Sequence, residues 1–116
     1  MSPLGSAARR ADAAPVFAAL GDGTRLRLVT RLSDDGPLSI ARLSDGTGVT
    51  RQAITKHLEA LADAGVVRGK RRGRERIWEL QTKRLEMASR YLNEVSGQWD
   101  AAIGRLRNFL EEESHG

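Results

Sequence analysis

The sequence predicts a mainly α-helical domain with one small β-hairpin. Apolar residues recur at helical spacing over most of the chain, and the pattern takes on strand character only between residues 66 and 80. Glycine-containing turns separate these segments. With 116 residues, the chain fits one domain on the usual prior of roughly 100–200 residues, which can bury one modest core.

Four helices are expected in the first half of the chain. Asp22, Ser39 and Thr50 are suited to be N-caps, and Gly65 is suited to end the last of the four. Residues 1–13 are rich in Ala and Arg and have no long apolar run, so we expect a disordered leader and not a signal peptide. Apolar side chains share one face in each predicted helix, over residues 14–20, 24–32, 40–45 and 51–64.

The second half is predicted to form a hairpin and then a long helix. Residues 66–70 and 76–80 have strand character and flank a tip in which Gly73 allows a positive φ. A helix over about residues 83–113 follows, with residues 114–116 as a tail. Thirty helical residues span about 45 Å, which is more than this domain can cover by itself. The apolar positions of this helix recur at spacings of three and four, at Leu85, Ala88, Leu92, Val95, Trp99, Ala102, Leu106 and Phe109.

This order of elements is that of a winged helix-turn-helix domain, α-α-α-α-β-β-α. The helices over 40–45 and 51–64 are joined by a glycine turn, and the hairpin after them makes the wing. The second helix of such a unit lies in the major groove of DNA. An ordinary amphipathic helix with a solvated polar face is the alternative, which the neighbouring turn and basic hairpin disfavour. On the outer face of the helix over 51–64, the residues expected to read bases are Arg51, Gln52, Thr55 and Lys56.

Positive charge is concentrated in the hairpin. Residues 66–76 hold six basic residues and one acid, a local charge of +5, in a chain whose net charge is +4. A GC-rich genome would explain the number of arginines equally well, but their position indicates a polyanionic partner. The residues expected to contact the DNA backbone are Ser39, Thr50, His57, Arg71, Arg72, Arg74 and Arg76.

The sequence contains no set of residues for catalysis. There is no cysteine and there are two histidines, which excludes a disulfide scaffold, a thiolate metal site and a cysteine nucleophile. No stretch approaches the length of a membrane span.

We therefore expect a cytoplasmic, sequence-specific DNA-binding regulator without a cofactor. The alternative is a winged-helix module whose main target is a protein or RNA, but its recognition helix would present apolar or aromatic side chains.

Three segments together form a recognisable pattern: Phe17-Ala-Ala-Leu-Gly-Asp-Gly-Thr-Arg25, Thr50-Arg-Gln-Ala-Ile-Thr-Lys-His-Leu58 and Leu61-Ala-Asp-Ala-Gly-Val-Val67 with the arginine-rich hairpin after it. With these segments the chain resembles the ArsR/SmtB winged-helix repressors of bacteria. The family usually has proline where this chain has Gly23. The resemblance extends from about Val16 to Glu111. It implies a homodimer that binds a pseudo-palindromic double-stranded DNA operator and blocks transcription.

The resemblance also implies a dimer interface built from the first and last helices. This agrees with the long apolar stripe of the last helix, which needs a partner. The alternative, in which the stripe packs only within its own subunit, is disfavoured by the length of the helix. The expected interface residues are Val16, Phe17, Leu20, Leu92, Val95, Trp99, Leu106 and Phe109.

The chain departs from the metal-sensing members of this family. Residues 39–43 contain no thiolate where many members have a Cys-x-Cys pair. In the last helix, Asp100, the acids at 111–113 and His115 do not have the spacing for a tetrahedral zinc site. The resemblance then implies a non-metal-sensing, autorepressor-like member, released by an anti-repressor protein or an unknown small-molecule inducer.

Overall fold

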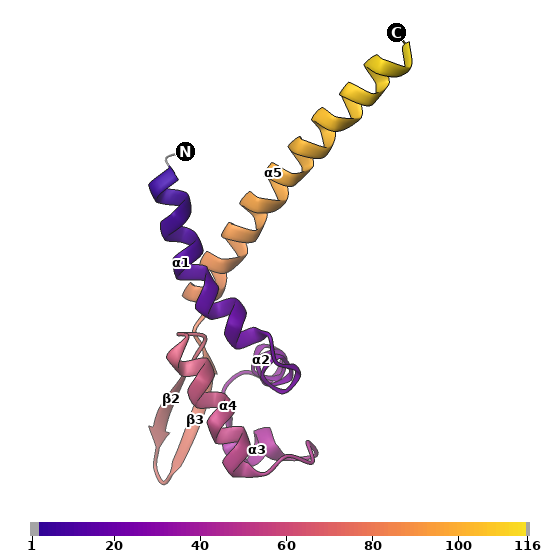
Figure 1. Ribbon diagram of the computed structural model, residues 1–116. Coiled ribbons are helices and arrows are strands. Elements are labelled where there is room, and N and C mark those ends of the chain that lie inside the picture. Colours follow the sequence, from indigo (N-terminus) through magenta and orange to yellow (C-terminus); the bar gives the residue numbers. More distant parts are fainter. Residues whose placement is uncertain (1–2, 116) are drawn as a thin grey trace.

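The elements follow the predicted winged-helix order, with one short strand in addition. The computed structural model describes residues 3–115, and the side chains of residues 9–113. Figure 1 shows a small body of helices and strands from which one long helix projects. The elements are α1 (Pro3–Leu20), α2 (Gly23–Asp35), β1 (Leu38–Ser39), α3 (Ile40–Ser44), α4 (Arg51–Asp63), β2 (Val67–Arg72), β3 (Glu75–Leu80) and α5 (Thr82–His115).

The predicted N-caps are confirmed at three helices. The side-chain oxygens of Asp22, Ser39 and Thr50 accept hydrogen bonds from the backbone N–H three residues further on, at 3.0, 3.3 and 3.1 Å. Each bond satisfies an N–H that has no partner within its helix. After α4, Gly65 takes a φ of 77°, the left-handed conformation that ends the helix.

The sheet has three antiparallel strands in the order β1-β3-β2. Trp78 in the middle strand pairs with Leu38 on one side and with Gly69 on the other. The sequence did not predict β1, which has two residues and exists through its pairing with β3. The wing, defined as the hairpin β2–β3, closes at Gly73, whose φ of 64° confirms the predicted tight turn.

The core lies between the sheet, α4, α2 and the adjoining parts of α1 and α5. Trp78 is 1% exposed and is the largest side chain at its centre. The apolar face predicted for α4 is confirmed, and in α2 Leu28 and Leu32 are buried, whereas the apolar side chain of Leu26 is 50% exposed. The core cluster contains Val16, Ala19, Leu28, Leu32, Leu38, Leu43, Ile54, Leu58, Leu61, Val66, Val67, Trp78 and Ala88.

The first helix begins at Pro3 and not at Ala14. The structure therefore replaces the expected disordered leader with helix over residues 3–13, and Pro15 lies inside α1. Alanine has the highest helix propensity, and this segment is rich in it. An ion pair also fixes α1 to α5, with 3.0 Å between Nε of Arg9 and Oε2 of Glu94. Residues 1, 2 and 116 lie outside the described residues.

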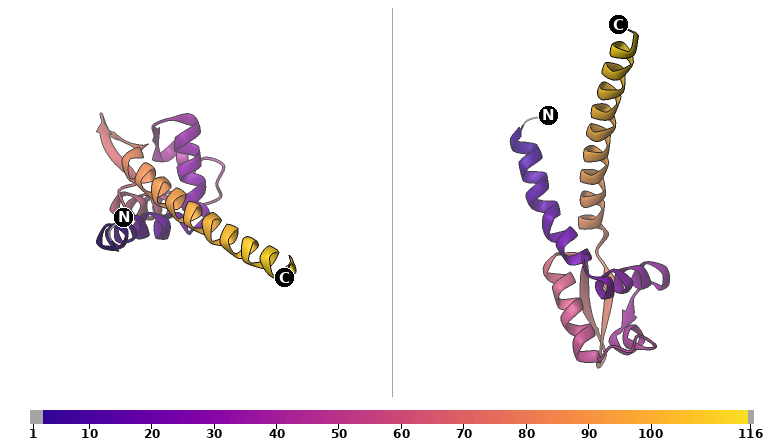
Figure 2. Two further views of the ribbon diagram at one scale, coloured as in Figure 1. Left: turned by 90° about the horizontal axis from the view of Figure 1, so that it is seen from above. Right: turned by 45° about the vertical axis from the view of Figure 1, so that its right-hand side comes forward.

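The last helix gives the molecule its elongated shape. With 34 residues, α5 is about 51 Å long at 1.5 Å per residue. The molecule measures 73 × 31 × 20 Å. Its radius of gyration is 19.8 Å, against about 13 Å for a compact chain of this length. Figure 2 shows that α1 and α5 both extend from the same end of the body, while the wing and α3 lie at the other end.

Candidate nucleic-acid interface

The recognition helix α4 presents a polar face to solvent. Its inward side chains, Ile54, Leu58 and Leu61, are fully buried and fix the orientation of the helix. Arg51 and Gln52 are exposed on its first turn, and neither side chain has a hydrogen bond or ion pair among the described residues. Donors and acceptors left without partners at the start of such a helix are available to base edges.

A shallow hollow of about 510 Å³ marks this outer face. Gln52, Thr55 and Lys56 line it together, so the structure places three of the four predicted base-reading residues side by side. The hydroxyl of Thr55 donates to the carbonyl of Arg51 at 2.8 Å, which leaves its oxygen able to accept. Glu59 also lines the hollow and was missed by the sequence analysis, although its position three residues after Lys56 places it on the same face.

The two helices of the helix-turn-helix unit are joined by a short turn rich in glycine. Gly46 and Gly48 have φ values of 73° and 70°, so both take the left-handed conformation. Between them, Thr47 donates its hydroxyl to the carbonyl of Ser44 at 2.8 Å and accepts from the N–H of Val49 at 3.1 Å. These bonds fix the turn that sets the relative position of α3 and α4.

Part of the positive charge of the wing is neutralised within the wing itself. The carboxylate of Glu79 forms ion pairs with Arg68 and Lys70, and its Oε1 is 3.1 Å from Nζ of Lys70. Hydrogen bonds from Arg68 and then from Lys70 hold the pKa of Glu79 below its ordinary value. Since Glu79 lies outside the basic stretch counted in the sequence, the charge count overstated the positive charge available to a partner.

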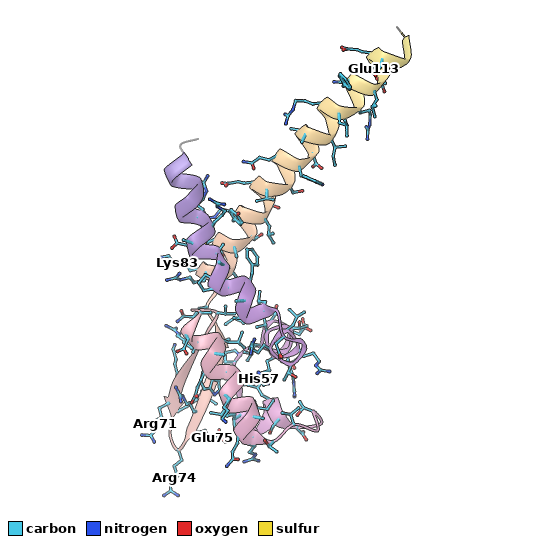
Figure 3. All side chains as sticks on the ribbon, in the orientation of Figure 1. His57, Arg71, Arg74, Glu75, Lys83 and Glu113 are labelled. Atoms are coloured by element: carbon cyan, nitrogen blue, oxygen red, sulfur yellow. The ribbon has the colours of Figure 1, made fainter. Side chains whose placement is uncertain are left out.

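Three arginines at the end of the wing keep their charges available. Arg71, Arg72 and Arg74 are exposed, and none of them has an ion pair or hydrogen bond among the described residues. Figure 3 shows Arg71 and Arg74 at the free end of the hairpin, the same end of the molecule as α3 and α4. A cluster of unpaired guanidinium groups in this position suits phosphate oxygens.

Arg76 makes a contact that the sequence analysis did not predict. Its guanidinium lies over the ring of Trp78, 4.5 Å from the ring centroid. Gly69 makes room for it, because a Cβ there would lie 2.5 Å from Nε of Arg76. The register sets Arg76 directly opposite Arg71, and like charges in such a pair repel. The stacking on Trp78 holds Arg76 in a fixed position on the wing.

His57 is turned toward the body of the protein. Its Nδ1 lies 3.8 Å from Oδ2 of Asp22, the N-cap of α2, and its side chain is 26% exposed. Figure 3 places His57 between the recognition helix and α2. The sequence predicts that His57 contacts the DNA backbone, and this stays a prediction, since the imidazole is turned toward the N-cap of α2.

The predicted dimer residues fall into two groups. On α1, Val16 is fully buried, while Phe17 and Leu20 pack against the core, with the ring of Phe17 6.4 Å from that of Tyr91. These α1 side chains are thus used within the subunit. The predicted α5 residues are exposed. Ile103 and Leu110, which the sequence analysis did not name, lie on the same exposed face. The whole set is Leu92, Val95, Trp99, Ile103, Leu106, Phe109 and Leu110.

The described part of the chain offers neither a metal cluster nor a membrane span. No group of three or more His, Asp or Glu side chains among residues 9–113 could hold a metal ion. No helix over the described residues is long and apolar enough to cross a membrane.

Comparisons with known proteins agree with this geometry. Residues 20–70 match a family model described as a helix-turn-helix domain. The chain is 41% identical over 68 residues to the HTH-type transcriptional regulator YuzN of Bacillus subtilis, covering 53% of this chain and 74% of that protein. It is 37% identical over 95 residues to the HTH-type transcriptional regulator Rv2034 of Mycobacterium tuberculosis, covering 82% of this chain and 85% of that protein.

Solved structures show the same likeness in three dimensions. An ArsR-like transcriptional regulator from Rhodococcus sp. RHA1 superposes with a TM-score of 0.74 at 34% identity, covering 85% of this chain and 92% of that one. The homodimeric winged helix-turn-helix domain of Mb0332 from Mycobacterium bovis has a TM-score of 0.63 at 24% identity, covering 84% of this chain and 88% of that one. At this lower identity the likeness concerns the fold alone.

The fold, the outward polar face of α4 and the arginine-rich wing define a winged helix-turn-helix, DNA-binding transcriptional regulator. Such proteins are regulators and not enzymes. The chain belongs to the ArsR family. The family and fold class predicted from the sequence are therefore confirmed, and a protein- or RNA-directed module is not favoured.

Proposed function

We propose that the protein is a homodimeric repressor that binds a pseudo-palindromic DNA operator. One observation carries this proposal. The unpaired polar side chains of α4 and the unpaired arginines of the wing lie at one end of the molecule, and an exposed apolar helix leaves the other end. Two copies joined through that helix present two recognition helices to the same duplex.

Base reading is assigned to the outer face of α4. Arg51 has the donors to pair with guanine O6 and N7, and Gln52 has the amide to pair with adenine N6 and N7. Lys56 and Thr55 follow one turn later on the same face. We place Arg51 and Gln52 at the centre of recognition because they stand on the first turn of the helix, where base edges are approached.

Phosphate contacts are assigned to the wing and to the caps of the helix-turn-helix unit. Arg71, Arg72 and Arg74 supply the charge. Ser39 and Thr50 already cap α3 and α4, so each marks a helix N-terminus at which a phosphate is favoured. We assign His57 and Arg76 a supporting role, because their contacts within the protein hold the recognition helix and the wing in place.

Dimerisation is assigned to α5. Leu85 and Ala88 pack within their own subunit, and beyond them six apolar positions recur in steps of three and four from Leu92 to Phe109, the spacing of a left-handed coiled-coil seam. The neighbour Mb0332 is homodimeric, which supports a second copy as the partner of this seam. A two-fold dimer places its recognition helices about 34 Å apart, one turn of the duplex.

Control of the repressor is assigned to a signal other than a metal ion. The chain has no cysteine, and its last helix lacks the ligand spacing of a zinc site. An anti-repressor protein or a small-molecule inducer, acting in the cytoplasm where the DNA lies, then releases the operator. The operon that encodes the repressor itself is the first candidate for the genes that it represses.

Fluorescence anisotropy tests this proposal with duplex DNA from upstream of the protein's own gene. A scrambled duplex is the control, and both are measured at two salt concentrations. Preferential binding with a two-fold-symmetric footprint supports a dimeric autorepressor. Equal, salt-sensitive binding to both duplexes means that the operator lies elsewhere. Absence of binding to any duplex contradicts the proposal and favours a protein or RNA target.

A further inference from the structure

A second hollow lies behind the helix-turn-helix unit, on the side away from the outer face of α4. It has a volume of about 310 Å³ and opens between α2 and the segment that joins α3 to α4. Figure 1 shows this segment below α2 as a loop that stands off the body. The volume is within the range of small-molecule sites, which begins at roughly 300 Å³.

The floor of the hollow is apolar, and its lining carries two arginines and one carboxylate, that of Asp45. Leu28, Leu43 and Ile54, which belong to the buried core, form the floor. Arg27 and Arg31 stand on successive turns of α2 at the rim. Such a site favours a ligand whose apolar part covers the floor and whose anionic group meets the guanidinium groups.

The two rim arginines are held differently: Arg27 has one long contact, whereas Nε of Arg31 also lies 3.6 Å from Oδ2 of Asp35 in an ion pair. A guanidinium nitrogen of Arg27 lies 3.5 Å from the hydroxyl oxygen of Thr24. Arg31 donates to the carbonyls of Leu43 and Asp45, each at 3.5 Å. These distances exceed the 2.7–3.2 Å of normal N–H···O hydrogen bonds, so an anion can compete for Arg27 at small cost. At Arg31 the anion replaces the two long bonds and competes with the carboxylate of Asp35.

We propose that this hollow binds a small organic acid with an apolar tail and that binding regulates the protein. The contacts of Arg31 supply the coupling, since they tie α2 to the last turn of α3. A carboxylate that draws Arg31 toward itself removes this tie. The regulatory half of the inference rests on the proposed operator binding, whereas ligand binding itself does not.

The turn next to the hollow can transmit the change. Gly46 and Thr47 line the hollow, and the turn contains two glycines in the left-handed conformation. Because Ile54 on the floor belongs to α4, a ligand there contacts both helices of the helix-turn-helix unit. Displacing α3 relative to α4 changes how the unit fits a duplex, and the operator affinity falls.

Octanoate is the probe for this class of ligand, used below its micelle concentration. Acetate carries the head group without the tail, octanol carries the tail without the head group, and inorganic phosphate carries charge alone. Backbone amide chemical shifts of the protein are followed by NMR. We expect saturable shifts centred on Gly46 and Thr47, with acetate, octanol and phosphate all weaker than octanoate.

Variants at the rim test the assignment. Arg27→Gln and Arg31→Gln each remove a charge and should weaken octanoate binding about tenfold, the effect of losing one charge-assisted hydrogen bond. Arg42→Gln is the matched control, because Arg42 is an exposed arginine of the neighbouring helix α3 that does not line the hollow. It should bind octanoate like the unaltered protein.

The outcomes separate ligand binding from operator binding. Saturable binding that also lowers operator affinity in anisotropy supports the whole inference. No binding of octanoate, shifts confined to the exposed face of α5, or an equal effect of phosphate each overturns it. Saturable binding without an effect on operator affinity overturns the regulatory half. A protein that binds no duplex even without octanoate contradicts the proposed function and leaves the binding result standing.

Discussion

Nδ1 of His57 lies 3.8 Å from Oδ2 of Asp22, so a residue of the recognition helix meets the N-cap of α2. The next turn continues the chain of contacts, because Nε of Arg25 donates to the carbonyl of Ala19 at 2.6 Å. The end of α1, the start of α2 and the middle of α4 are thereby held together. The orientation of the recognition helix depends on this junction as well as on the core beneath it.

The charge of Asp22 should stabilise the fold only above acidic pH. A hydrogen bond from the N–H of Arg25, with the nearby charges of His57 and Arg25, lowers the pKa of Asp22 below its ordinary value, against an opposing effect of desolvation. A lowered folded-state pKa means stability that is complete above the unfolded-state value of about 3.9 and is lost as the pH falls through the folded-state value.

Asp22→Asn tests this, because asparagine caps a helix as well as aspartate does but carries no charge. The urea midpoint of Asp22→Asn should be lower than that of the unaltered protein at pH 7, and the two should converge as the pH falls below the lowered folded-state pKa of Asp22. An undiminished gap at acidic pH would show that the charge is not responsible. His57→Ala in the same series reports how much of the effect depends on the imidazole.

Loss of a base-reading side chain should relax operator preference. Arg51→Ala and Gln52→Ala should each reduce discrimination between operator and scrambled duplex by roughly 1–3 kcal/mol, with non-specific binding nearly intact. Competition anisotropy measures the two affinities. Arg10→Ala is the control, since Arg10 is exposed on α1 at the far end of the molecule. Uniform weakening on all duplexes would argue against base reading.

Removal of the wing arginines should reduce the salt dependence of binding. Arg72→Ala and Arg74→Ala should each lower the slope of log K against log[salt] by about 0.9, the value for one phosphate contact. Arg68→Ala is a matched control on the same hairpin, because Arg68 is paired with Glu79. The salt slope of Arg68→Ala should change less. Equal slopes for all three variants would show that the wing tip does not contact phosphates.

A charge in the exposed face of α5 should separate the subunits. Trp99 is 68% exposed in the single chain, so Trp99→Asp should leave the monomer folded and abolish the dimer and tight operator binding. Light scattering and circular dichroism measure the two effects. Val16→Ala provides the contrast, since Val16 is fully buried and its truncation should cost on the order of 2 kcal/mol of stability without changing the oligomeric state. A dimeric Trp99→Asp would place the interface elsewhere.

Truncation of the cap of the recognition helix should weaken the fold and the binding together. Thr50 accepts a hydrogen bond from the N–H of Ala53, and Thr50→Ala should cost about 1 kcal/mol of unfolding free energy. Thr50→Ser keeps the hydroxyl and should restore most of that stability. Denaturation in urea measures the unfolding free energy of both variants. Equal losses in Thr50→Ala and Thr50→Ser would show that the methyl group of Thr50, and not its hydroxyl, is responsible.

Features that depend on nearby residues could be predicted from the sequence. The caps at Asp22, Ser39 and Thr50 and the turn at Gly73 are each decided within a few residues. The outer face of α4 follows from the spacing of its buried residues. Strand β1 could not be predicted, because its two residues form a strand through pairing with β3, distant in sequence.

Other features depend on contacts that periodicity does not reveal. His57 lies at the boundary between the buried and exposed faces of α4, and the position of Asp22 decides which way it turns. Val16 has an apolar side chain that suits a core or an interface equally, and contact between α1 and α5 within one chain decides for the core. The helix predicted from residue 14 begins at Pro3 in the structure, because the alanine-rich segment before Pro15 continues it in the N-terminal direction.

The exposed apolar face of α5 has a consequence for how repression responds to gene dosage. Each chain carries one recognition helix, so in the proposed dimer tight occupancy of a two-fold operator would require two chains joined through α5. At concentrations below the dimer dissociation constant, the amount of dimer rises as the square of the amount of chain, by mass action. A repressor of its own operon would then shut off synthesis over a narrow range of protein level, and substitutions along α5 would move that range without altering which sequence is read.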